Sequence, residues 1–170
     1  MRTDRVRPVL VVVGSLSGVA REQVRRLVGE YGHVAFPVES GETGAPEKTV
    51  AVARDALAGC TCAVVHSPEE RSASGEAMLA SLAEVVARLS EEERFGGLVL
   101  TGGATAVGVA RRLGATGIRL QGEVEAGVPM GTLVGPAPYP VVTKAGGFGG
   151  PDTLVGAVEA LARDGEERDP

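Results

Sequence analysis

Aromatic residues and long apolar runs are both scarce in this chain. Aromatics make up 3% of the 170 residues, with no tryptophan. Hydrophobic residues still reach 44%, so we expect one compact domain with a core of valine, leucine and alanine. No apolar run approaches the roughly 20 residues of a membrane span, and residues 1–7 lead into a short strand rather than a signal peptide. We therefore expect a cytoplasmic protein without a membrane partner.

Cysteine and histidine are also rare, with two of each. Cys60 and Cys62 lie two apart in an apolar run, where a strand would place both on one side at a spacing unsuited to a disulfide. His33 and His66 complete no metal-ligand spacing with them. We interpret the cysteines as buried reduced thiols and predict no metal site.

A concentration of positive charge is missing as well. The net charge is −5 and the isoelectric point is near 5.1. Basic residues are scattered among acidic ones and do not form a stripe with interleaved aromatics, which argues against nucleic acid as a partner.

Common nucleotide-binding and catalytic signatures are absent from the sequence. It contains no G-x-x-x-x-G-K-[ST] and no G-x-G-x-x-G after a strand, so neither a Walker-type NTPase nor an ordinary dinucleotide fold is indicated. No Ser/His/Asp set is evident either, and the catalytic residues stay unknown.

Apolar runs alternate with helical patterns along most of the chain. This alternation predicts an α/β layered domain with an open, largely parallel or mixed sheet flanked by helices. We expect residues 1–163 to form this single domain, with a flexible tail at 164–170. Glycines and prolines at 121–139 indicate a small hairpin inserted before the last strand. The predicted strands lie near 8–13, 33–38, 61–66, 97–101, 116–120 and 140–143, and the clearest predicted helices at 18–29, 47–58, 76–89 and 152–163.

Three loops of small residues each follow an apolar strand and precede a helical pattern or a proline-led helix start. They are Gly14–Gly18, Thr101–Thr105 and Thr143–Gly150, called here the first, second and third loops. Glycines let backbone N–H groups approach an anion, hydroxyls add donors, and the next helix directs its positive end there. The three loops together predict a phosphate-binding site at the carboxyl edge of the sheet.

Lys144 is the lysine inside these loops, and Lys48 is the only other one in the chain. A lysine before Ala145-Gly146-Gly147 suits a point charge for phosphate, against the alternative of a lysine stem lying along the strand end. Asp152 is the one carboxylate beside the third loop. It could hold magnesium or orient a hydroxyl, but an acidic residue in the first turn of a helix is favoured by the helix dipole alone.

In this order, the loops resemble the nucleotide-binding C-terminal domain of the four-carbon acid sugar kinase family. The resemblance rests on Gly14-Ser15-Leu16-Ser17, Gly102-Gly103-Ala104-Thr105 and Lys144-Ala145-Gly146-Gly147-Phe148-Gly149, supported by Gly127-Val128-Pro129 before the last strand. It covers nearly the whole chain, from Val9 to about Leu161.

The resemblance implies ATP binding, with Mg²⁺ as the companion ion. It places Ser15, the segment Gly102, Gly103, Ala104 and Thr105, and also Gly146 against ATP. From their chemistry we add Ser17 and Lys144 as neighbours. The family usually has Asn at position 147 and Pro-Val-Thr at 18–20, where this chain has Gly147 and Gly18-Val19-Ala20. Both departures bear on the strength of nucleotide binding.

Nothing in the sequence resembles the family's substrate-binding N-terminal domain. Members phosphorylate sugar acids such as threonate and erythronate. One hypothesis is therefore the ATP-binding domain of such a kinase, which needs a substrate-binding domain in cis or on another chain for turnover. The alternatives are a non-catalytic nucleotide-sensing or assembly module that keeps the fold, and a stand-alone enzyme whose site is completed in a homo-oligomer.

Overall fold

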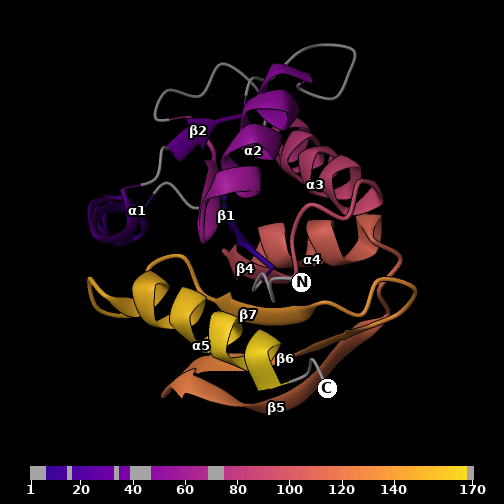
Figure 1. Cartoon of the computed structure of the whole chain (residues 1–170). Helices are drawn as coiled ribbons and strands as arrows, with labels where there is room; N and C mark the ends of the chain where they lie inside the picture. Colours follow the sequence, from indigo (N-terminus) through magenta and orange to yellow (C-terminus); the bar gives the residue numbers. More distant parts are fainter. Residues whose placement is uncertain (1–6, 15–16, 33–34, 39–46, 69–74, 168–170) are drawn as a thin grey trace, which may run out of the picture.

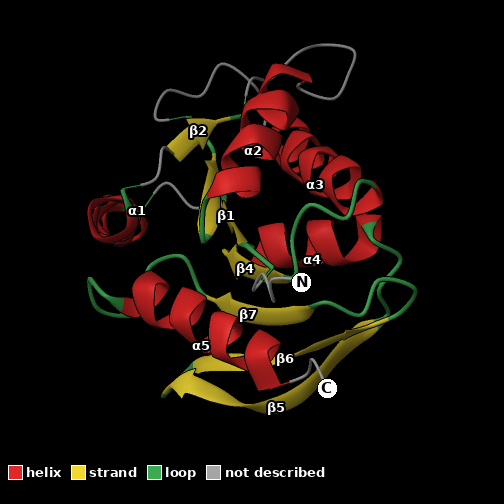
Figure 2. Cartoon of the chain, in the orientation of Figure 1, coloured by secondary structure: helices red, strands yellow, loops and turns green. Residues whose placement is uncertain are grey.

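The computed structural model describes residues 7–14, 17–32, 35–38, 47–68 and 75–167, which form one sheet with helices on both faces (Figures 1 and 2). The strands are β1 Val9–Val13, β2 Ala35–Pro37, β3 Cys62–His66, β4 Gly97–Thr101, β5 Gly117–Glu125, β6 Val128–Val134 and β7 Pro140–Lys144. The helices are α1 Gly18–Tyr31, α2 Glu47–Gly59, α3 Gly75–Glu91, α4 Gly103–Arg112 and α5 Thr153–Glu167.

The seven strands lie in the order β2-β3-β1-β4-β7-β6-β5. Five of them are parallel, and the β5–β6 hairpin continues the sheet in antiparallel pairing with β7. β1 and β4 are buried at every position, as expected for parallel strands covered on both faces. The α/β prediction with a mixed sheet is therefore confirmed.

Alternate residues of β1 pack into two separate cores, one on each face. Leu10 and Val12 join the core beneath α2, α3 and α4. Val9, Val11 and Val13 join the core beneath α1 and α5. The two groups of helices are visible on opposite sides of the sheet in Figure 1. Consequently, the helix that follows each loop covers either one face of the sheet or the other.

The predicted elements agree with the structure to within two residues at each end, except at three places. Residues 33–34 of the strand predicted at 33–38 lie outside the described residues. The strand predicted at 116–120 continues to Glu125 and is itself the first half of the hairpin, so the hairpin spans 117–134 as an edge of the sheet. Helix α5 reaches Glu167, beyond the predicted helix end. Cys60 precedes β3 and is half-buried, whereas Cys62 is buried within it, so the two thiols do not share a strand face. Among the described helices, none is both long and apolar enough to cross a membrane.

Candidate functional site

The three loops leave neighbouring strands at the same edge of the sheet. In the register of the sheet, Val13 lies beside Thr101, and Thr101 lies beside Lys144. Backbone hydrogen bonds continue past the strand ends: Gly14 N donates to Thr101 O at 3.2 Å, and Gly102 N donates to Lys144 O at 2.9 Å. The loops are therefore adjacent although they lie far apart in the sequence.

The helices after the first two loops depart on opposite faces. Helix α1 packs into the core shared with α5, and α4 packs into the core shared with α2 and α3. In an open α/β sheet, such a switch point between neighbouring strands creates a crevice at their carboxyl ends, where ligands bind. Here the switch lies between β1 and β4, with the loop after β7 beside it.

The second loop combines strained backbone with open space. Gly102 has φ +101°, in the region that favours glycine, and it precedes the first residue of α4. A Cβ added at Gly103 would meet no atom of the described residues within 4 Å, and Ala104 is exposed. The N-terminus of α4 is therefore accessible to a ligand.

The first loop touches the second closely. A Cβ added at Gly14 would lie 1.8 Å from Thr105 Oγ1, and Thr105 itself is buried. Ser67, which follows β3, donates from Oγ to Gly14 O at 3.4 Å. Thr105 thus lies at the contact between the two loops, and Ser67 is a supporting residue that sequence reasoning missed. Ser15 lies outside the described residues.

Ser17 connects the first loop to the third. Its Oγ accepts a hydrogen bond from Ala20 N at 3.1 Å, as predicted for an N-cap. The same hydroxyl donates to Gly146 O at 2.9 Å. The structure therefore brings Ser17 and Gly146 together, as expected for members of one site.

Lys144 is buried at the end of β7, with 4% of its surface exposed. Its Nζ donates to Ala145 O at 2.8 Å and to Gly146 O at 3.3 Å. Burial lowers the pKa of this ammonium, and the charge of Glu125 acts against that shift. Two of its three N–H donors thus bind carbonyls of its own loop.

The Asp152 carboxylate pairs with a residue outside the three loops. It forms an ion pair with Arg26 of α1, with Nε and Oδ1 2.7 Å apart and both side chains largely exposed. This hydrogen bond raises the pKa of Arg26. Within the described part of the chain, no group of three His, Cys, Asp or Glu side chains is placed to hold a metal ion.

Gln23 binds the third loop, but its sequence pattern did not identify it as a site residue. It is fully buried on α1 between Ala20 and Leu27, so spacing alone marks it as part of the helix's core stripe. Its Nε2 donates to Phe148 O at 3.0 Å and to Gly150 O at 2.9 Å. A polar amide within an apolar stripe was the available signal, because buried amides need partners.

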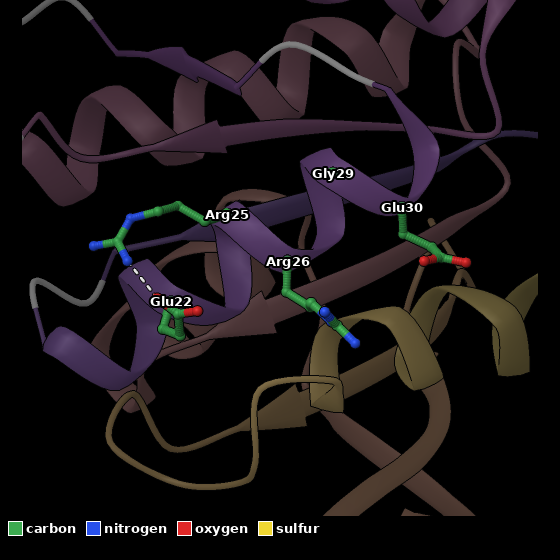
Figure 3. Close-up of a pocket in the computed structure, with 5 residues that line it drawn as sticks. All are labelled: Glu22, Arg25, Arg26, Gly29 and Glu30. Carbon is green, nitrogen blue, oxygen red and sulfur yellow. Dashed lines mark hydrogen bonds and ion pairs between the residues drawn. The ribbon is translucent and has the colours of Figure 1, made fainter.

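A surface depression lies elsewhere, on the solvent side of α1 (Figure 3). It has a volume of about 400 Å³ and is lined by Glu22, Arg25, Arg26, Gly29 and Glu30. Arg25 is directed at Glu22 and forms an ion pair with it. All its lining residues come from one helix, and none belongs to the three loops.

An open α/β sheet with three small-residue loops gathered at its switch point is typical of nucleotide-binding domains. Residues 10–154 match the family model of a nucleotide-binding C-terminal domain. The chain therefore belongs to the family of nucleotide-binding C-terminal domains found in four-carbon acid sugar kinases.

Relatives with assigned activities are kinases of four-carbon acids. The chain is 37% identical over 163 residues to a D-threonate kinase of Bordetella bronchiseptica, covering 91% of this chain and 40% of the relative. It is 33% identical over 181 residues to a D-threonate kinase of Salmonella typhimurium, covering 91% and 43%. The chain therefore spans about two fifths of the length of these relatives.

A solved structure from Bordetella bronchiseptica has the same fold, with a TM-score of 0.81 and 35% identity. The match covers 91% of this chain and 41% of that one. That structure is described as a domain of unknown function with bound citrate, in a domain-swapped dimer. A Haemophilus influenzae protein at 18% identity shares the fold with a TM-score of 0.68.

Proposed function

We propose that this chain binds ATP and ADP through its three loops and is the nucleotide half of a kinase for threonate-like sugar acids. The observation that carries the proposal is the adjacency of the loops after β1, β4 and β7 at the point where α1 and α4 leave opposite faces of the sheet. Similarity to kinases of four-carbon acids supports ATP as the ligand.

The proposed contacts to phosphate come mainly from backbone. Gly102, Gly103, Ala104 and Thr105 present the start of α4, and the open space at Gly103 lets an anion approach its backbone. Gly146 contributes from the third loop. Ser15 stays a proposed contact on the family resemblance alone, because it lies outside the described residues.

Ser17 and Lys144 have proposed roles close to the phosphates. The Ser17 hydroxyl fixes the start of α1 against Gly146. Lys144 contributes its positive charge from beneath the third loop, with two N–H groups already bound to carbonyls. We therefore assign Lys144 an electrostatic contribution and the shaping of its loop.

Magnitudes explain why several loops are needed. A micromolar ligand requires about 8 kcal/mol of net binding free energy. A helix terminus contributes about 0.3–1 kcal/mol at an exposed site, and a hydrogen bond to a charged group about 1.5–3 kcal/mol. A helix terminus with one or two such bonds stays below this total, so contacts from several adjacent loops are expected to add up to it.

Among the described residues, we assign Mg²⁺ no protein ligand. The described residues place no cluster of metal-binding side chains at the loops, and Asp152 is paired with Arg26. Magnesium would arrive as the counter-ion of ATP, where it neutralises phosphate charge.

We further propose that residues 1–163 act as a single nucleotide-binding domain and that the acceptor acid is held by a separate substrate-binding domain. The length of the relatives supports this, because 60% of the Bordetella kinase has no counterpart in this chain. A homo-oligomer is a further possibility, in line with the domain-swapped dimer of the related structure.

A non-catalytic nucleotide-sensing module is the second candidate, and Gly147 favours it. The family resemblance places Asn at this position, and a Cβ at Gly147 would meet no atom within 4 Å. Crowding therefore does not explain why the asparagine amide is absent, because the position has room for a side chain. Gly147→Asn should strengthen ATP binding if the site retains the family's function.

Calorimetric titration of MgATP into the purified chain tests the proposed function. We expect a dissociation constant in the micromolar range and a loss of at least tenfold in Gly103→Val. Gly108→Val is the matched control, because Gly108 also lies in α4 with no atom within 4 Å of an added Cβ. Failure of the wild-type chain to bind at millimolar ATP, or an equal loss in both variants, would contradict the proposal.

A further inference from the structure

The carbonyl groups of the third loop are turned toward donors within the protein. Lys144 binds Ala145 O and Gly146 O, and Ser17 also binds Gly146 O. Gln23 binds Phe148 O and Gly150 O. Backbone N–H groups can cradle an anion only when the neighbouring carbonyls point away from it. These side chains therefore hold four carbonyl oxygens of the loop by hydrogen bonds.

Gln23 costs stability at its position. The side chain is fully buried, and its Oε1 has no hydrogen-bond partner in the described part of the chain. An unsatisfied buried polar group is unfavourable, so an apolar residue would suit this helix stripe better. Both atoms facing Nε2 are carbonyl acceptors, which fixes the orientation of the amide. Its evident gain is the pair of bonds to the third loop.

The two carbonyls that Gln23 holds flank a strained residue. Gly149 has φ +91°, and a Cβ there would lie 2.4 Å from Thr153 Oγ1. Glycine adopts positive and negative φ about equally readily, so the hydrogen bonds on both sides of Gly149 favour one conformation of this turn. Gln23 thus determines how the chain turns from β7 into α5.

We propose that Gln23 is a positioning residue that orients the third loop for phosphate binding and fixes it relative to the first loop. It lies on α1, the helix that begins at the first loop, and it acts through residues more than a hundred positions later in the chain. This inference rests on the proposed ATP function for its ligand, but the loop geometry it describes exists without ligand.

Gln23→Met is the test variant, because methionine is an apolar residue of similar length to glutamine and donates no hydrogen bond. Leu27→Ala is the control: Leu27 is fully buried on the same stripe one turn later, and its truncation destabilises α1 packing without touching the loop. We expect Gln23→Met to weaken MgATP at least tenfold and adenosine less than twofold. Leu27→Ala should leave both affinities within twofold while lowering the melting temperature.

Amide hydrogen exchange of the unliganded chain provides a second readout that does not need nucleotide. In Gln23→Met, we expect faster exchange and shifted resonances at Phe148 and Gly149, with α5 beyond its first turn unchanged. In Leu27→Ala, any acceleration should spread along α1 instead.

The outcomes separate this inference from the proposed function. If the wild-type chain binds no ATP, the proposed function fails and the exchange data alone decide the role of Gln23. Equal loss of ATP and adenosine affinity in Gln23→Met, or unchanged exchange at Phe148 and Gly149, would overturn the inference.

Discussion

Glycines of the three loops serve different purposes at the level of single residues. Gly14 allows close contact between two loops, since its missing side chain leaves room for Thr105. Gly103 faces open space, which an anion can use. Gly149 supplies a left-handed turn. Substitutions at these positions should therefore separate packing effects from binding effects.

Gly14→Ala should destabilise the fold, whereas Gly103→Ala should not. The added Cβ at position 14 would overlap Thr105 Oγ1, and overpacking of this kind costs about 1–3 kcal/mol. At position 103 we expect a change within about 0.5 kcal/mol. Urea denaturation of both variants measures the difference. The double variant Gly14→Ala/Thr105→Ala should recover part of the loss, and no recovery would contradict the assigned contact.

Lys144 should make stability depend on pH in the alkaline range. Because burial lowers its folded-state pKa below the ordinary 10.5, the folded chain releases this proton before the unfolded chain does. Stability attributable to Lys144 therefore rises as the pH increases from the lowered pKa toward 10.5. Relative to Lys144→Met, the free energy of unfolding of the wild type should increase as the alkaline pH is raised toward 10.5. A difference that stays constant over this range would show that the ammonium is not desolvated.

At the level of elements, the β5–β6 hairpin supports the third loop. The ring of Phe148 lies against the hairpin turn, since a Cβ added at Gly127 would be 2.7 Å from its Cζ. Near this turn, Glu125 at the end of β5 accepts a hydrogen bond from Thr153 Oγ1 at 2.7 Å. The hairpin thus contacts both the loop and the first residue of α5.

Gly127→Ala should weaken this support in two separable ways. The turn residue has φ +82°, so alanine costs about 1–2 kcal/mol in backbone strain, and its Cβ displaces the Phe148 ring. In a Phe148→Ala background only the backbone cost should remain. A double-mutant cycle by urea denaturation should give a coupling energy of at least about 0.5 kcal/mol. Additive effects would mean that the ring does not rest on the turn.

Individual helices and strands could be predicted from the sequence better than the contacts between them. The apolar run of β1, the N-cap Ser17 and the stripe of α3 each follow from short-range patterns. The hairpin was predicted too far along the chain, at 121–139 instead of 117–134, because β5 is mostly exposed and carries a bulge near Gly122. Both features obscure the strand alternation. The bonds from Gln23 to the third loop could not be predicted, since they depend on which strands become neighbours.

At the level of the whole molecule, the chain should bind nucleotide without completing phosphoryl transfer. It spans about two fifths of its D-threonate kinase relatives, and the proposed nucleotide site lies at the one sheet edge where its three loops meet. At ATP concentrations a hundredfold above the dissociation constant, we expect a stabilisation of about 2.7 kcal/mol.

Coupled-enzyme detection of ADP with D-threonate measures turnover. We expect none above the background of the Gly103→Val variant. Steady turnover by the chain alone, abolished in that variant, would contradict the separate-domain proposal and favour a stand-alone enzyme.

The hydrogen bond from Ser17 to Gly146 joins groups 129 residues apart, and this separation bears on how the protein forms during synthesis. Parallel pairing between distant segments is slow, because the chain must lose loop entropy before contacts compensate. On the ribosome, β1, β3 and β4 can associate while later strands are still untranslated. The third loop joins them only after β7 has emerged. Nucleotide binding should therefore be acquired late during translation, only after the third loop has been synthesised.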